Sequence, residues 1–245
     1  MRYKRLSKEI ELVRGSILPV SLIETAVIAT NDLFVELTRV APYVNDLLGM
    51  RNLSAFVGAT FGAELSRISD GLLVLNPHQD GYPDLLLMDS VGLSSWTSLS
   101  KNLKEKSFFS PFPSGGIEIK ATVGAVESAK ALTKKGLAKP EIGDSRIHLV
   151  KSIDWKAHHR ETNHLLALYW DFINGLPTIA AVMYSADLSD SDWGKMVLPV
   201  EGGGKTTSVS IMTKSGVAKL AKNCLLVLDD PRYEGLIART ASYPN

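Results

Sequence analysis

The sequence predicts an α/β fold with a central mixed β-sheet flanked by helices. Apolar residues recur at helical spacing in the first third of the chain, up to Ile68. Short apolar and β-branched runs follow, and the run at 177–184 has the composition of a buried strand. Helix-like and strand-like segments then alternate toward the C-terminus, which is typical of α/β architecture.

Composition limits what the chain can be. Its 245 residues, 45% of them hydrophobic, suffice for one large domain or two small ones. The net charge of +1 gives no global sign of nucleic-acid binding, although a locally basic cleft is compatible with it. The single cysteine, Cys224, excludes an intrachain disulfide and a cysteine zinc site, and we expect it to be buried. Apolar runs are too short to span a membrane and the N-terminus lacks a signal-type segment, so we expect an intracellular, cytoplasmic protein.

Helices are expected first. The basic, polar residues up to Arg14 are compatible with a short helix, and Asn31 suits a helix cap. Pro42 predicts a kink or break before a second helix at 53–68. A strand at 71–75 and a turn-rich link then lead into the stretch on which the functional interpretation depends.

That stretch, 81–122, places acidic residues beside two predicted strands. Asp84 follows Pro83 and precedes the apolar run 85–88. In the second strand, the period of two puts Glu118 and Lys120 on one face and the intervening apolar residues on the other. Two carboxylates can hold a hard divalent cation through oxygen, and a lysine can act beside the reacting water and phosphate.

Pro83-Asp84, a spacer, and Glu118-Ile119-Lys120 between apolar residues together resemble the motif of the PD-(D/E)xK nuclease superfamily, whose members include type II restriction endonucleases. The 34 positions from Asp84 to Glu118 lie within the range of that superfamily. The motif is short and degenerate, and an exposed turn aspartate followed by an ordinary Glu/Lys strand face is its structural alternative. Asp80 and Asp89 are rival acidic residues without the Pro-Asp context.

The resemblance implies a restriction-endonuclease-like core and a role for each motif residue. Asp84 and Glu118 would bind Mg²⁺, with the backbone carbonyl of Ile119 as a further oxygen ligand. Lys120 would orient the attacking water or help to deprotonate it. Glu64 matches only loosely the acidic residue that a preceding helix often contributes, and a solvated position is its alternative.

The resemblance therefore implies a magnesium-dependent, site-specific type II deoxyribonuclease of prokaryotic type, acting on double-stranded DNA as a homodimer. It covers roughly residues 55–185 of a single nuclease domain spanning 1–245, and residues 186–245 would contribute to DNA recognition. The alternatives are a repair or junction-resolving nuclease on the same core and a non-catalytic DNA-binding module.

Further residues are candidates for contacts with DNA. His158 and His159 lack the partners of a zinc site and suit polar contacts better. The glycine-rich run before Lys205 imitates a phosphate-binding loop, but Pro199 stands where that loop needs glycine. Lys205, Thr206 and Thr207 would instead form a DNA-reading element or an ordinary hairpin turn. The lysine-containing region 91–115 is expected to be a loop along a phosphate backbone or a solvated basic loop.

The remaining segments complete the expected fold. We expect a helix or a helix passing into a strand at 163–174, a solvated acidic loop at 187–192, and a polar tail from Asp229. The other expected elements are a helix at 124–135, a strand at 147–150, the strand at 177–184, a helix at 215–222 and a strand at 225–228.

Overall fold

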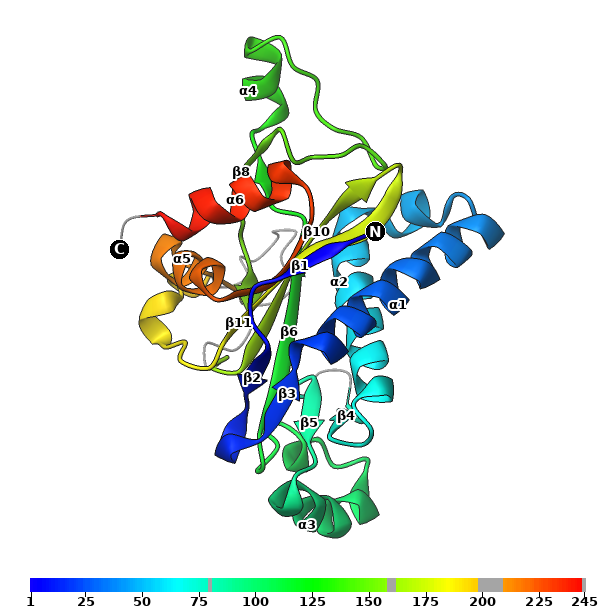
Figure 1. Cartoon of the computed structure of the whole chain (residues 1–245), viewed down its shortest axis with the longest axis vertical. Helices are drawn as coiled ribbons and strands as arrows, with labels where there is room; N and C mark the ends of the chain where they lie inside the picture. The colour runs from blue at the N-terminus through cyan, green and yellow to red at the C-terminus, as the bar shows by residue number, and fades with distance from the viewer. Residues whose placement is uncertain (79–80, 158–161, 198–208, 244–245) are drawn as a thin grey trace.

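A seven-stranded mixed sheet forms the centre of the computed structural model (Figure 1), in the order β1-β13-β11-β10-β6-β5-β4. The structure describes residues 1–78, 81–157, 162–197 and 209–243. Only the contact between β6 and β10 is parallel, and the other neighbours in the sheet are antiparallel. The predicted fold class, a mixed sheet flanked by helices, is confirmed.

The elements have the following bounds. The strands of the central sheet are β1 (Tyr3–Arg5), β4 (Leu73–Leu75), β5 (Leu85–Leu87), β6 (Gly116–Thr122), β10 (Leu165–Ile173), β11 (Leu176–Ser185) and β13 (Cys224–Leu228). The outlying strands are β2 (Glu9–Glu11), β3 (Ile17–Pro19), β7 (Ala125–Val126), β8 (Val150–Ser152), β9 (Lys156–Ala157) and β12 (Ser210–Ile211). The α-helices are α1 (Val20–Val40), α2 (Val44–Ile68), α3 (Ser90–Leu99), α4 (Ala129–Lys134), α5 (Lys214–Lys222) and α6 (Pro231–Ala241).

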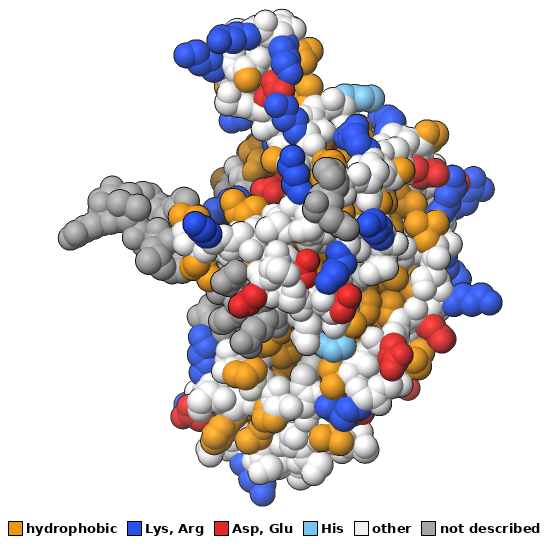
Figure 2. All heavy atoms as spheres, turned by 90° about the vertical axis from the view of Figure 1, so that its left-hand side faces the viewer, with side chains coloured by type: hydrophobic (Ala, Val, Ile, Leu, Met, Phe, Trp, Pro, Cys, Tyr) orange, Lys and Arg blue, Asp and Glu red, His pale blue; other side chains and the backbone are white. Residues whose placement is uncertain are grey.

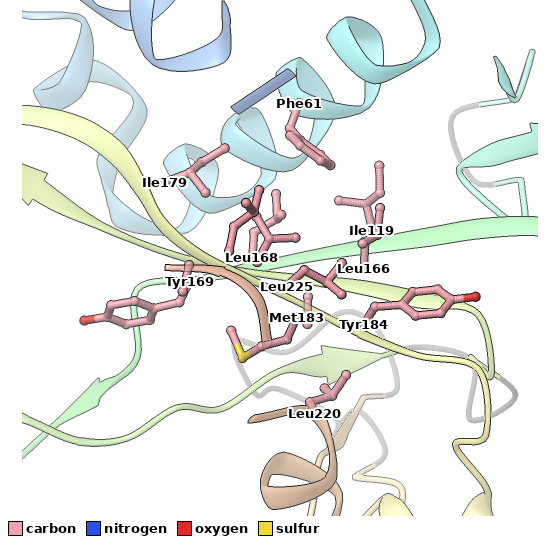
Figure 3. Close-up of a cluster of buried hydrophobic side chains, with 14 of the residues drawn as sticks. Phe61, Ile119, Leu166, Leu168, Tyr169, Ile179, Met183, Tyr184, Leu220 and Leu225 are labelled. Carbon is pink, nitrogen blue, oxygen red and sulfur yellow. The ribbon is translucent and has the colours of Figure 1, made fainter. Parts of the chain in front are cut away.

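Helices cover both faces of the sheet, α1 and α2 on one side and α5 and α6 on the other (Figure 1). Figure 3 shows Phe61 reaching from α2 toward the sheet, while Leu220 approaches from α5 on the opposite side. α2 packs closely on β6 at Gly62, where an added Cβ would lie 3.0 Å from Ile119 Cδ1 and would displace the end of that side chain. Close contact and hydrophobic burial therefore both hold β6 under α2.

Residues 165–173 form a strand throughout, so the helix expected there is wrong. β10 lies in the middle of the sheet between β6 and β11, and eight of its nine residues are buried. A strand buried on both faces shows no alternation of polar and apolar residues, and its apolar run cannot be distinguished from a buried helix by periodicity. Pairing with the parallel strand β6, which is distant in sequence, makes this segment a strand instead of a helix.

Polar residues account for further differences from the sequence prediction. Asn31 lies inside α1 rather than at a cap, because its buried amide donates to Tyr3 Oη (2.8 Å) and accepts from Ile179 N (2.9 Å). Asp192 is buried in a capping box with Ser189 rather than solvated. Asp230 caps α6, so the expected polar tail is a helix.

Three other segments also differ. The N-terminal residues form β1 and the β2–β3 hairpin instead of a helix. The helix expected at 124–135 is limited to α4, preceded by β7. The 91–115 region contains α3, whose underside packs on a small separate core that includes Leu86, Phe109 and Phe112. Pro42 does separate α1 from α2, and Cys224 is buried, as predicted.

Asp171 is a buried junction between β10, the 145–147 segment and α6. Its side chain, fully buried, accepts hydrogen bonds from Ser145 Oγ, Arg146 N, Ile147 N, Phe172 N and Tyr233 Oη at 2.8–3.1 Å. A buried carboxylate is tolerated when its oxygens are satisfied in this way. This residue therefore ties the crossover between the parallel strands β6 and β10 to the sheet. Within the described part of the chain, no helix is long and apolar enough to cross a membrane.

We expect Asp171→Asn to lower the free energy of unfolding by about 2–4 kcal/mol, because an amide nitrogen would face backbone N–H groups that now donate to carboxylate oxygen. Urea denaturation followed by circular dichroism measures this change. Asp32→Asn, on the exposed side of α1, removes the same charge and should change stability by less than about 0.5 kcal/mol. Equal small effects of both variants would show that Asp171 has no such anchoring role.

Candidate active site

Asp84 and Glu118 lie opposite each other where β5 begins. The β5–β6 register pairs Leu85 with Ile117, and its continuation pairs Asp84 with Glu118. Glu118 Oε2 accepts from Asp84 N (3.3 Å), and Asp84 Oδ2 accepts from Ile119 N (2.7 Å). The structure thus brings together two carboxylates that are 34 positions apart in the sequence.

The backbone of Ile119 points toward the same edge as Asp84. Glu118 N donates to His164 O on the β10 side (2.9 Å), and successive residues of a strand direct their backbone groups to opposite sides. The N–H and C=O of Ile119 therefore face β5. There the register would place Pro83, which has no N–H to donate to the Ile119 carbonyl. Proline thus ends the ladder where a carbonyl oxygen is needed beside the two carboxylates.

Lys120 completes the group through an ion pair with Glu118. Burial raises the pKa of Glu118 to about 7 against the effect of the Lys120 ammonium, and the neighbouring Asp84 carboxylate adds to the rise. Burial alone would lower the pKa of Lys120, but the charges of Glu118 and Asp84 outweigh it, and that pKa is raised. Lys120 therefore stays protonated near neutral pH and can donate hydrogen bonds, whereas the pKa of Glu118 lies in the neutral range.

A cleft of about 560 Å³ opens beside this group, between α2 and the end of β6. Small residues of α2 form one wall, including Gly58 and Gly62. The cleft also contains a second cation, Lys156 of β9. Its other lining residues are Ser54, Ala55, Ala59, Leu75, Asn76, His78, Asp84, Ile119, Lys120 and Ala121.

The donor set suits a hard cation that retains water. Two carboxylates and one backbone carbonyl supply oxygen only, and Mg²⁺ in proteins is commonly bound by one or two carboxylates with several waters. Among the described residues no group of three or more His, Cys, Asp or Glu side chains could hold a metal ion. The oxygen atoms that could hold such a cation are those of the Asp84 and Glu118 carboxylates and of the Ile119 carbonyl.

Other predicted residues do not join this group. Glu64 pairs with Arg67 one turn along α2 and does not line the cleft. Asp89 caps α3 and pairs with Arg14. The rival Asp80, and the proposed DNA contacts His158, His159, Lys205, Thr206 and Thr207, lie outside the described residues.

Asn76 is a site residue that sequence reasoning missed. Its side-chain amide donates to Pro83 O (2.9 Å) and to Phe109 O (2.8 Å), which ties the turn before Asp84 to the α3 region. The same side chain accepts from His78 N (3.0 Å). An asparagine before proline predicts only a turn. Because the partner at Phe109 is 33 positions away, no local pattern indicates this pair of hydrogen bonds.

Comparisons of the chain with protein-family models, with curated proteins and with solved structures found no match.

Magnesium affinity should depend on pH through Glu118. A proton on Glu118 competes with the cation, so affinity should rise with pH up to about 7 and level off above it. Below that value we expect up to about tenfold weaker binding per pH unit. Isothermal titration calorimetry in buffers of different ionisation enthalpy measures both the affinity and the proton release.

Two variants make that measurement specific. Glu118→Gln should bind weakly at every pH and release no proton, whereas Glu64→Gln should keep the wild-type pH dependence, since Glu64 lies outside the cleft. Wild-type binding that is unchanged between about pH 5.5 and pH 8 would contradict the competition.

Proposed function

We propose that the protein is a magnesium-dependent endonuclease that hydrolyses phosphodiester bonds in double-stranded DNA, of type II restriction character. The observation that carries this proposal is the joining of Asp84, Glu118, Lys120 and the Ile119 carbonyl at one sheet edge beside a cleft. The order of elements also supports it. Helix α2 is followed by the antiparallel strands β4, β5 and β6, and the next strand of the central sheet, β10, runs parallel to β6.

The chain's residues have distinct roles in this proposal. Asp84, Glu118 and the Ile119 carbonyl would hold Mg²⁺, which would lower the pKa of bound water and neutralise charge on the phosphate. Lys120, kept protonated by its acidic neighbours, positions the attacking water and stabilises the negative charge of the pentavalent transition state. The motif allows this lysine either to orient the attacking water or to help deprotonate it. Its raised pKa favours the first role, in which the protonated lysine donates a hydrogen bond. Lys156 is placed to contact a phosphate in the cleft.

The remaining features of the proposal follow from a restriction role. A palindromic target cut in both strands needs two such sites, and a two-fold homodimer supplies them. Residues 186–245 would add contacts with DNA, and the protein would act in the cytoplasm of a prokaryotic cell.

The test is incubation of the purified protein with mixed-sequence plasmid DNA in magnesium and in EDTA. Discrete fragments in magnesium alone support a site-specific nuclease, and a smear supports a repair or structure-directed nuclease on the same core. Binding without cleavage, on methylated and unmethylated DNA, would overturn the catalytic role in favour of a binding module.

Asp84→Asn and Lys120→Ala should each reduce the cleavage rate by at least about 10²–10³-fold, because each removes a group that acts on the developing charge. Single-turnover cleavage of an end-labelled plasmid fragment measures the rate, with circular dichroism to establish folding. Glu64→Gln is the matched control and should cut within about twofold of wild type. A folded Lys120→Ala protein with wild-type rate would remove that lysine from the mechanism.

A further inference from the structure

A projecting segment follows the strand that carries Glu118 and Lys120. Residues 125–151, named here the α4 arm, comprise β7, α4, the loops and the start of β8. Figure 1 shows this arm extending beyond the end of the sheet, away from α1 and α2. Most of its length lies outside the main core, which leaves its surface available to a partner.

The arm carries a net positive charge, because residues 125–151 contain six Lys and Arg residues against three Asp and Glu residues. Residues 128–140 contain four lysines and no acidic residue, against a net charge of +1 for the whole protein. Lys130, Lys134, Lys135 and Lys139 are all exposed. Glu127 pairs with Lys135 and with Lys151. Within the described residues, Lys130, Lys134 and Lys139 form no ion pair. Their charges therefore do not stabilise the fold through ion pairs.

The scaffold that carries these lysines is fastened to the body. β7 pairs with β8, and Leu132 of α4 is buried. Arg239 donates to Val150 O (3.3 Å) and Tyr243 Oη to Lys151 O (3.1 Å), both from the C-terminal region. Asp171 also holds the 145–147 segment, as described above. The base of the arm is thus anchored to the body, which lowers the entropy lost when the arm binds a partner.

The basic surface continues from the arm onto α6. A hollow of about 360 Å³ at its base is lined by His148 of the arm and by Arg232 and Arg239 of α6. Figure 2 shows Lys and Arg side chains gathered on the projection at the top of the molecule and continuing below it. A row of cations over this length suits an extended polyanion better than a single small anion.

The arm is also at a useful distance from the catalytic group. From Glu118 to Thr122, where β6 ends, the strand advances about 13 Å at its usual rise. Duplex DNA advances about 3.4 Å per base pair, so the base of the arm lies about four base pairs from the carboxylates. A duplex that places one phosphate at Lys120 can therefore have flanking phosphates within reach of the arm.

We propose that the α4 arm binds the phosphate backbone of duplex DNA on the flank of the cleavage site. This inference rests on the proposed nuclease function and adds the surface that holds the substrate. Phosphate contacts of this kind set the register and affinity of the duplex without reading its sequence. The arm then contributes to binding and leaves the chemical step to the residues at the sheet edge.

The test compares Lys130→Gln/Lys134→Gln/Lys139→Gln with wild type, using fluorescence anisotropy of a labelled duplex of about 30 base pairs in EDTA, across a salt series. Loss of three phosphate contacts should lower the slope of log affinity against log salt by about 2–3. The apparent KM for plasmid cleavage should rise, while the single-turnover rate at saturating DNA stays near the wild-type value.

Lys8→Gln/Arg39→Gln/Arg51→Gln is the charge-matched control, since these side chains are exposed and lie outside the arm, the cleft and residues 186–245. An equal loss in the control, or an unchanged salt slope in the arm variant, would overturn the proposal even if wild type cuts DNA. Arm-dependent binding to anionic vesicles, without such dependence for the duplex, would also overturn it. Wild-type protein that neither binds nor cuts DNA would instead refute the proposed function.

Discussion

The burial of the Glu118 carboxylate beside Asp84 and the Lys120 ammonium is the constraint on which the site depends. Glu118 is only 5% exposed and the half-buried Asp84 lies opposite it, so a second carboxylate stands next to a buried one. The Ile119 N–H and the Lys120 ammonium satisfy them in part, and the pKa of Glu118 remains raised to about 7. Positive charge added near Glu118 would stabilise the ionised form of its carboxylate. The fold therefore maintains an unfavourable concentration of negative charge, and carboxylates with such perturbed pKa values are concentrated at functional sites.

The carboxylates come together because the backbone ladder between β5 and β6 ends early. Pro83 interrupts the pairing of β5 with β6, and Asn76 takes up the Pro83 carbonyl that would otherwise face Ile119. Asp84 replaces that carbonyl as the acceptor for Ile119 N. The exchange turns an ordinary antiparallel edge into a set of oxygen atoms, while α2, packed closely through Gly62, keeps β6 in place. Local chemistry and distant packing are both required, since neither alone orients the carboxylates.

The sequence predicts the motif residues because strand alternation is local. Glu118 and Lys120 share a face, as the period of two requires, and Asp84 precedes its strand as expected. What depends on distant partners is missed. β10 is a strand because it lies beside β6 and β11, and Asn31 sits within a helix because Tyr3 and Ile179 require its amide. Glu64 is directed by helix geometry away from the cleft, a fact that a loose positional match cannot reveal.

A single strand joins the sheet-edge group to the α4 arm, and this continuity gives the two surfaces a fixed relation. β6 is packed under α2 and paired with both β5 and β10, so its far end cannot shift independently of Glu118. Asp171 fastens the returning part of the arm to β10, the parallel neighbour of β6. Contacts made by the arm would therefore position a bound duplex relative to the carboxylates without a flexible linker. Binding of this kind, equal in the ground state and the transition state, would lower KM without changing the rate of the chemical step.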